Sequence, residues 1–288
     1  MRKFIGALLL SVCFAAPAQA YDWTLNVDTF PDHSVYRQPQ IRATWTGNAH
    51  DSRESQGAEK STYVVSTGTN SGTCPGGHKC IEFKLPAGSV GGTWGPYGSM
   101  GYIVQVQGAP VVSIEWDILF ETGFDMHSVG KIPFSLGVWD RSAKRWQTQR
   151  TNWQCASGQG RPTCAANHAV FVNYLQNDAT GGHNGCASTY LKWPIETNVW
   201  YHFKQQVDQT DPARPRGRIW IKRPSDPVMV KVFDCAWVPP SGRVDPDHAI
   251  QVAHNSWFGG NGPNDKAQVT SYHMVANVHV YSGDTGQP

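Results

Sequence analysis

The chain has 288 residues, with 24 Lys and Arg against 22 Asp and Glu and a formal net charge of +2. This near balance argues against a nucleic-acid partner, because proteins that bind nucleic acids present a strongly basic surface. The 29 glycines, 19 prolines and 11% aromatic residues are typical of short strands joined by turns and argue against a mainly helical protein.

Residues 1–20 have the pattern of a secretory signal peptide. Arg2 and Lys3 precede an apolar run over 4–16, and Ala18-Gln19-Ala20 supplies a small-x-small cleavage site. The apolar run is too short to span a bilayer and no later segment is longer, so we expect no membrane contact. We predict a mature chain of residues 21–288 that forms a single domain and is secreted or periplasmic. Loss of Arg2 and Lys3 brings its net charge near zero.

The remaining cysteines are even in number, which in an exported chain predicts disulfides. They are Cys74, Cys80, Cys155, Cys164, Cys186 and Cys235. Six cysteines allow 15 pairings, and sequence alone does not choose among them. We expect Cys74–Cys80 around a Pro-Gly-Gly turn, Cys155–Cys164 around a Gly-rich loop, and therefore Cys186–Cys235. The absence of a Cys-x-x-Cys pair disfavours zinc, and we expect no cofactor. A structural calcium ion remains an alternative, although no EF-hand loop is present.

Apolar alternation between turn clusters predicts strands along most of the chain. They cover 62–66, 80–84, 101–107, 111–120, 132–139, 146–153, 169–175, 200–207, 217–222, 228–233, 250–258 and 272–281. No long segment has the 3.6-residue apolar period of a helix, so helices should be short and few. The sequence therefore predicts an all-β fold, a β-sandwich of two antiparallel sheets. The long loops over 152–168 and 176–192 are candidates for function.

Three carboxylates, Glu115, Asp117 and Glu121, have even spacing and should share one face of a strand. Retaining glycoside hydrolases of the laminarinase type use a similar Glu-x-Asp-x-x-Glu pattern, but the spacing here is one residue longer. A solvated strand face is the favoured interpretation, and a hydrolase using these three residues is the least favoured function.

Lys131 stands at the start of the apolar strand predicted over 132–139. It is either a rim residue whose stem covers apolar surface or a cleft residue that uses its charge. Polar side chains that alternate on two later segments are candidates to line the same cleft: Thr148, Arg150 and Asn152 on one, Tyr174 and Gln176 on the other.

A lysine, an arginine and a tyrosine in one cleft suit β-elimination of a uronate-containing polysaccharide. That reaction removes the proton on C5 and expels the 4-linked sugar. It needs a cation to neutralise the carboxylate and the enolate-like intermediate. Lysine or tyrosine can act as the base, and a tyrosine hydroxyl can protonate the departing oxygen. Exposed Arg and Tyr are common on strands, so the residues alone support this chemistry only weakly.

An ordered series of short motifs over roughly 111–281 resembles a known family. GFDMHSVGKIPFSLG (123–137) resembles GFDF-x-x-GGKLPGL-x-G, QRTNW (149–153) resembles ARLMW, the segment 199–207 resembles W-x-x-x-x-Q-x-V, and SWFGG (256–260) with VANVHVY (275–281) resembles FFGG and F-x-N-F-x-V. These motifs are those of polysaccharide lyase family 14, of the alginate lyase type, and the related glucuronan lyases of family 20.

The resemblance implies a β-jelly roll whose concave sheet binds an acidic polysaccharide. Lys131 matches the family's essential lysine, Arg150 its cleft arginine and Tyr174 the first of two tyrosines. Gln176 replaces the second tyrosine, and glutamine cannot act as an acid or base near neutral pH. Thr148 stands where the family has serine.

Phe134 occupies a position where the family has glycine, which would narrow the cleft or change the substrate.

Histidines and tryptophans offer further candidates. His127 and His254, and less directly His183, could replace the missing proton-transfer group because imidazole titrates near neutral pH. Each is more often structural. Trp94, Trp153 and Trp257 are candidates to stack on sugar rings, with core packing the default interpretation.

The sequence thus predicts a secreted, monomeric polysaccharide lyase whose substrate is an acidic polysaccharide. Lys131 and Arg150 would handle the carboxylate and the intermediate's charge, and Tyr174 the proton transfer. Thr148, Asn152, Gln176, His127 and His254 would bind substrate. The main alternative is a noncatalytic carbohydrate-binding protein on the same fold.

Overall fold

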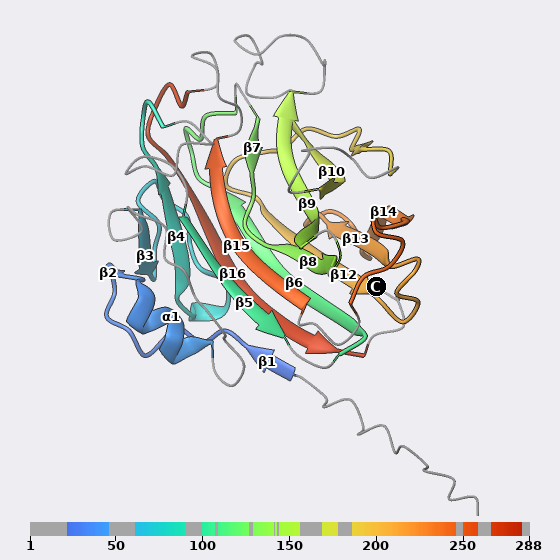
Figure 1. Cartoon of the computed structure of the whole chain (residues 1–288). Coiled ribbons are helices and arrows are strands. Elements are labelled where there is room, and N and C mark those ends of the chain that lie inside the picture. The colour runs from blue at the N-terminus through green and yellow to red at the C-terminus, as the bar shows by residue number, and fades with distance from the viewer. Residues whose placement is uncertain are drawn as a thin grey trace, which may run out of the picture.

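Antiparallel strands form nearly all of the regular structure in the computed structural model of the chain (Figure 1). It describes residues 22–45, 61–89, 100–106, 109–126, 129–140, 142, 144–155, 169–177, 186–245, 250–258 and 266–283. The strands are β1 (Asp22–Thr24), β2 (Ser34–Val35), β3 (Thr62–Val65), β4 (Cys80–Leu85), β5 (Met100–Val106), β6 (Val111–Phe120), β7 (Gly130–Lys131), β8 (Ser135–Asp140), β9 (Arg145–Cys155), β10 (Ala169–Asn177), β11 (Thr189–Tyr190), β12 (Trp200–Asp208), β13 (Arg216–Lys222), β14 (Val230–Ala236), β15 (Ile250–Phe258) and β16 (Ser271–Ser282). Helix α1 (Gln38–Thr44) and the short 3₁₀ turn η2 (Pro75–Gly77) complete the described elements.

The strands form two sheets, which confirms the predicted sandwich. The nine-stranded sheet has the order β14-β13-β12-β6-β16-β4-β3-β2, with β1 paired to β16. The seven-stranded sheet has the order β11-β10-β9-β7-β15-β5, with β8 paired to both β15 and β9. Every pairing between these strands is antiparallel.

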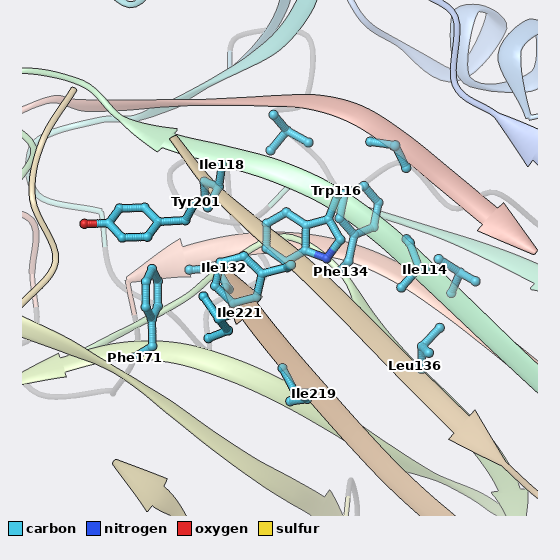
Figure 2. Packing of buried hydrophobic residues seen from close by; sticks show 14 of the residues in the cluster. Ile114, Trp116, Ile118, Ile132, Phe134, Leu136, Phe171, Tyr201, Ile219 and Ile221 are labelled. Carbon is cyan, nitrogen blue, oxygen red and sulfur yellow. The ribbon is translucent and has the colours of Figure 1, made fainter. Parts of the chain in front are cut away.

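The core lies between the two sheets and is rich in aromatic side chains (Figure 2). Trp116 on β6 stacks on Phe203 of β12 with ring centroids 4.6 Å apart. Phe171 of the seven-stranded sheet meets Phe203 edge to face at 5.0 Å. Burying each such ring stabilises the fold by about 2–3 kcal/mol, so these contacts hold the two sheets face to face.

The strand predicted over 132–139 begins too early. The strand conformation is interrupted between β7, which ends at Lys131, and β8, which begins at Ser135. Pro133 has no N–H for a sheet ladder, and Phe134 has a φ of +66°, in the left-handed region. Its ring is fully buried and packs 5.3 Å from Trp116 and 6.4 Å from Trp45. Phe134 therefore fills the core and does not narrow a cleft, which corrects the sequence-based expectation.

Disulfides Cys74–Cys80 and Cys186–Cys235 are present as predicted. Cys164 lies outside the described residues, so the third pairing stays a prediction, as does the signal peptide over 1–20. Within the described ranges, no helix has the length and apolar character needed to cross a membrane.

Candidate active site

One face of the seven-stranded sheet gathers most of the predicted site residues. Arg150 and Asn152 alternate on β9, with Tyr174 of β10 directly opposite Arg150. Lys131 of β7 lies opposite Asn152. Residues directly opposite each other on antiparallel strands share a face, while the alternate residue Trp153 points into the core. We call the face that carries Lys131 the site face.

Lys131 and Tyr174 are in direct contact on the site face. The Lys131 ammonium donates a hydrogen bond to the Tyr174 hydroxyl, and its Nζ lies 4.7 Å from the centre of the ring. The hydroxyl in turn donates to Oδ1 of Asn152 at 3.3 Å. Tyr174 and Asn152 are 5% and 6% exposed, whereas Lys131 and Arg150 are partly exposed. The two cations are thus the members of this group that are most open to solvent.

Gly130 and Trp153 fix the backbone at Lys131. A Cβ on Gly130 would lie 1.8 Å from the Trp153 ring. Only glycine therefore allows the backbone of β7 to pack this closely on the indole. The Ser256 hydroxyl also donates to the Lys131 carbonyl at 3.0 Å. Trp153 is fully buried, which makes it a support beneath the site and not a surface for sugar stacking.

The remaining predicted site residues are placed less completely. Thr148 is buried and lies opposite Gln176 on β10. For Gln176, and for His254 of β15, only the backbone is described, and His254 pairs with Tyr102. His127, His183 and Trp94 lie outside the described residues. Trp257 pairs with Lys131 at the backbone level.

The carboxylates Glu115 and Asp117 lie on the other sheet, on its outer face. Both contact His202, whose Nδ1 is 2.6 Å from Asp117 Oδ1 and whose Nε2 is 3.5 Å from Glu115 Oε2. Burial opposes the charge on His202, but the two carboxylates outweigh it and raise its pKa to about 9. The hydrogen bond from His202 lowers the pKa of Glu115 to about 2. These groups form an ion-paired surface and lie far from Lys131.

Glu121 shares the outer face with Glu115 but is fully buried. It lies beside Glu82 of β4, which raises its pKa, and we call the two the carboxyl pair. Backbone N–H groups of the segment 66–79 cover them, from Asn70 to Glu121 and from Thr69 to Glu82. Desolvation and the neighbouring Glu82 raise the pKa of Glu121 to about 8. The three carboxylates therefore do not form a hydrolase cleft.

Aromatic residues that the sequence reading missed also lie on the site face. Tyr190 of β11 lies opposite Val172, which is opposite Asn152. Trp139 and Trp146, a facing pair at the β8–β9 turn, meet edge to face at 5.1 Å. β11 has only two residues, too few for a periodic signal. The alternation of Trp146 with Arg150 and Asn152 was the one available clue.

Within the part of the chain that the structure describes, no group of three or more His, Cys, Asp or Glu is placed to hold a metal ion. The structural calcium ion stays an untested expectation.

Comparison with solved structures identifies known proteins that have a similar fold. No protein-family model and no curated protein matches the sequence. The structure of alginate lyase Aly36B is similar with a TM-score of 0.61 at 15% identity, over 93% of this chain and 98% of that one. An Aly36B variant in complex with alginate trisaccharide gives 0.62 at 14% identity, over 91% and 98%.

A PL-14 alginate lyase from the marine Aplysia kurodai is also similar. Its TM-score is 0.57 at 12% identity, over 91% of this chain and 98% of that one. The resemblance seen in the short motifs thus extends to nearly the whole three-dimensional structure. The chain therefore has the β-sandwich fold that these alginate lyases share.

Proposed function

We propose that this protein is a secreted polysaccharide lyase that cleaves a uronic-acid-containing polysaccharide by β-elimination. The observation that carries the proposal is the hydrogen bond from Lys131 to the Tyr174 hydroxyl, with Arg150 directly opposite Tyr174 on the same sheet face. This arrangement supplies two cations and a proton-transfer group at one place.

The charge of the site face favours an acidic substrate. Lys131 and Arg150 are both cationic, and no strand position on this face carries Asp or Glu among the residues described. A face with cations and no carboxylates attracts polyanions and repels none. Export is supported by the two disulfides, since disulfides persist in oxidising compartments.

The reaction follows from the contacts. Arg150 pairs with the C5 carboxylate through two parallel hydrogen bonds, which makes the C5 proton more acidic. The Lys131 ammonium donates its hydrogen bond to the Tyr174 oxygen, and Tyr174 acts as the base that removes the C5 proton. The electron pair of the C5–H bond becomes the C4–C5 double bond as the C4–O4 bond breaks. Tyr174 then gives its proton to the departing oxygen, while Lys131 stabilises the charge on the intermediate.

The similar structures support the substrate class. Aly36B and the protein from Aplysia kurodai are alginate lyases, and Aly36B variants were seen with alginate trisaccharide and tetrasaccharide. The Aly36B variant with bound tetrasaccharide has a lysine and a tyrosine replaced by alanine. This is the pair of residue types that meet here as Lys131 and Tyr174.

Binding without cleavage is the second candidate function. Gln176 lies two residues after Tyr174 on β10 and opposite Thr148, where the resembling family has a second tyrosine. A glutamine there can hydrogen-bond a sugar carboxylate but cannot transfer its proton. If Tyr174 does not suffice for both proton transfers, the site face would hold the polysaccharide intact.

An absorbance assay decides between the two. Incubation with alginate, glucuronan and related polyuronates should produce the ultraviolet absorbance of the C4–C5 double bond. Lys131→Ala should abolish that signal. Lys84→Ala, on β4 of the other sheet, should leave it unchanged. No absorbance from any polyuronate, together with retained binding, would replace the lyase by the binding protein.

A further inference from the structure

Tyr190 is unusual among the aromatic side chains of the described chain. It is 53% exposed, and the other large hydrophobic side chains that are comparably exposed in the described ranges are valines. It belongs to neither hydrophobic cluster. Core packing therefore does not explain an aromatic ring at this position, on β11 at the edge of the seven-stranded sheet.

The strand register aligns Tyr190 with Lys131. Tyr190 lies opposite Val172 on β10, Val172 lies opposite Asn152 on β9, and Asn152 lies opposite Lys131 on β7. Directly opposed residues share a sheet face, so the Tyr190 ring belongs to the site face. Three steps between neighbouring strands separate it from Lys131, about 14 Å across the sheet.

We propose that Tyr190 is an outer sugar-binding subsite, where the ring stacks on a sugar unit of a polysaccharide lying across the strands. The inference rests on the proposed function and specifies the path of its substrate. An exposed aromatic ring offers a flat apolar surface for the C–H face of a sugar, and its hydroxyl a hydrogen bond to a sugar oxygen. At this distance from Lys131, the ring meets a unit beyond those flanking the scissile bond.

The Trp139–Trp146 pair defines the competing path. Trp146 lies six residues before Asn152 on β9, about 20 Å along the strand. A polysaccharide lying along β9 would reach this pair and miss Tyr190. The path across the strands is favoured because Tyr190 and Lys131 are in one row. In addition, the two indoles already cover each other, and both are only partly exposed.

The subsite predicts a dependence on substrate length. Tyr190→Ala should weaken binding of alginate oligomers long enough to reach the edge strand by roughly 3- to 10-fold, the range of one aromatic stacking contact. Oligomers confined to the neighbourhood of Lys131 should bind equally well with and without the ring. Tyr190→Phe keeps the ring and should retain most of the affinity.

The experiment is titration calorimetry in the Lys131→Ala background, with alginate and glucuronan oligomers from dimer to octamer. Four proteins are compared: Lys131→Ala alone and its combinations with Tyr190→Ala, Tyr190→Phe and Trp146→Ala. Circular dichroism and thermal melting check that each folds. Tyr190→Thr, a good strand former, replaces the alanine variant if that variant does not fold.

The expected result is a loss that appears only with long oligomers and only in the Tyr190→Ala protein. Equal affinities with and without the Tyr190 ring would overturn the subsite and leave the proposed function intact. A length-dependent loss in Trp146→Ala instead would assign the path along β9 and also overturn it. If the Lys131→Ala protein binds neither polyuronate at any length, the subsite and the proposed function both fail.

Discussion

Replacing Glu121 by glutamine tests the buried carboxyl pair, Glu82 and Glu121, beneath the segment 66–79. Burial and the neighbouring Glu82 raise the pKa of Glu121 from 4.5 to about 8 in the folded chain. Below pH 4.5 the Glu121 carboxyl is protonated in both the folded and the unfolded state. The stabilisation that the protonated carboxyl gives to the folded state is then fully present. Between pH 4.5 and 8 only the folded state holds the proton, so the free energy of unfolding falls as pH rises.

The magnitude follows from the size of the shift. Each pH unit inside this window costs up to about 1.4 kcal/mol, which gives an upper limit of about 4 kcal/mol between pH 5 and 8. Because Glu121 interacts with a second carboxyl nearby, we expect a smaller value of about 2–3 kcal/mol. Glu121→Gln keeps the shape and cannot ionise. Relative to the natural chain, it should gain this amount of stability between pH 5 and 8.

The assay is urea unfolding at several pH values from 5 to 8, with tryptophan fluorescence as the signal and the disulfides intact. Asp226→Asn is the control, because Asp226 pairs with Arg223, which does not titrate in this range. This pairing lowers the pKa of Asp226, so the carboxylate is ionised in both the folded and the unfolded state from pH 5 to 8, and the variant's deficit should be constant with pH. A stability difference for Glu121→Gln that is equally constant with pH would refute the raised pKa of Glu121.

Other substitutions test the support of the site and the outer face. Gly130→Ala should cost about 1–3 kcal/mol of unfolding free energy, because its methyl group would overlap the Trp153 ring, and it should also remove most of the proposed lyase activity. Unchanged activity would show that Trp153 does not support Lys131. His202→Gln should lower the free energy of unfolding most below pH 6.5, and the loss should shrink as pH rises through about 9, where the folded histidine loses its proton. Urea midpoints at pH 6 and pH 9.5 measure this loss. Equal losses at the two pH values would contradict the ion pairing of His202. Phe134→Gly should relieve about 1 kcal/mol of backbone strain from the left-handed conformation but lose about 3–5 kcal/mol of core packing. The activity per folded molecule should not change. Altered activity at unchanged stability would show that the Phe134 ring lies in the cleft.

Strong local patterns made much of the fold predictable. β6 and β15 have the predicted boundaries because their alternation runs from turn to turn. The break at Phe134 was missed because an apolar residue with positive φ looks like any other residue of an apolar run. Helix α1 and the two-residue β2 were missed because they are too short to show a period.

The site was predictable only in part. Alternation placed Arg150 and Asn152 on one face, but the contact between Lys131 and Tyr174 depends on the order of strands in the sheet, which no local pattern specifies. The even spacing of Glu115 and Glu121 gave their common face correctly. It could not reveal that this face is the outer one, or that Glu82 from another strand is the partner of Glu121.

The disulfide Cys186–Cys235 limits how the sandwich can move. Cys186 precedes β11, the last strand of the seven-stranded sheet, and Cys235 lies in β14, the last strand of the nine-stranded sheet. The bond joins the two sheets covalently along the edge formed by β11 and β14. Any opening between the layers must therefore occur on the opposite side, near β5 and β2. The edge that carries Tyr190 keeps its distance from the other sheet for as long as the surroundings stay oxidising.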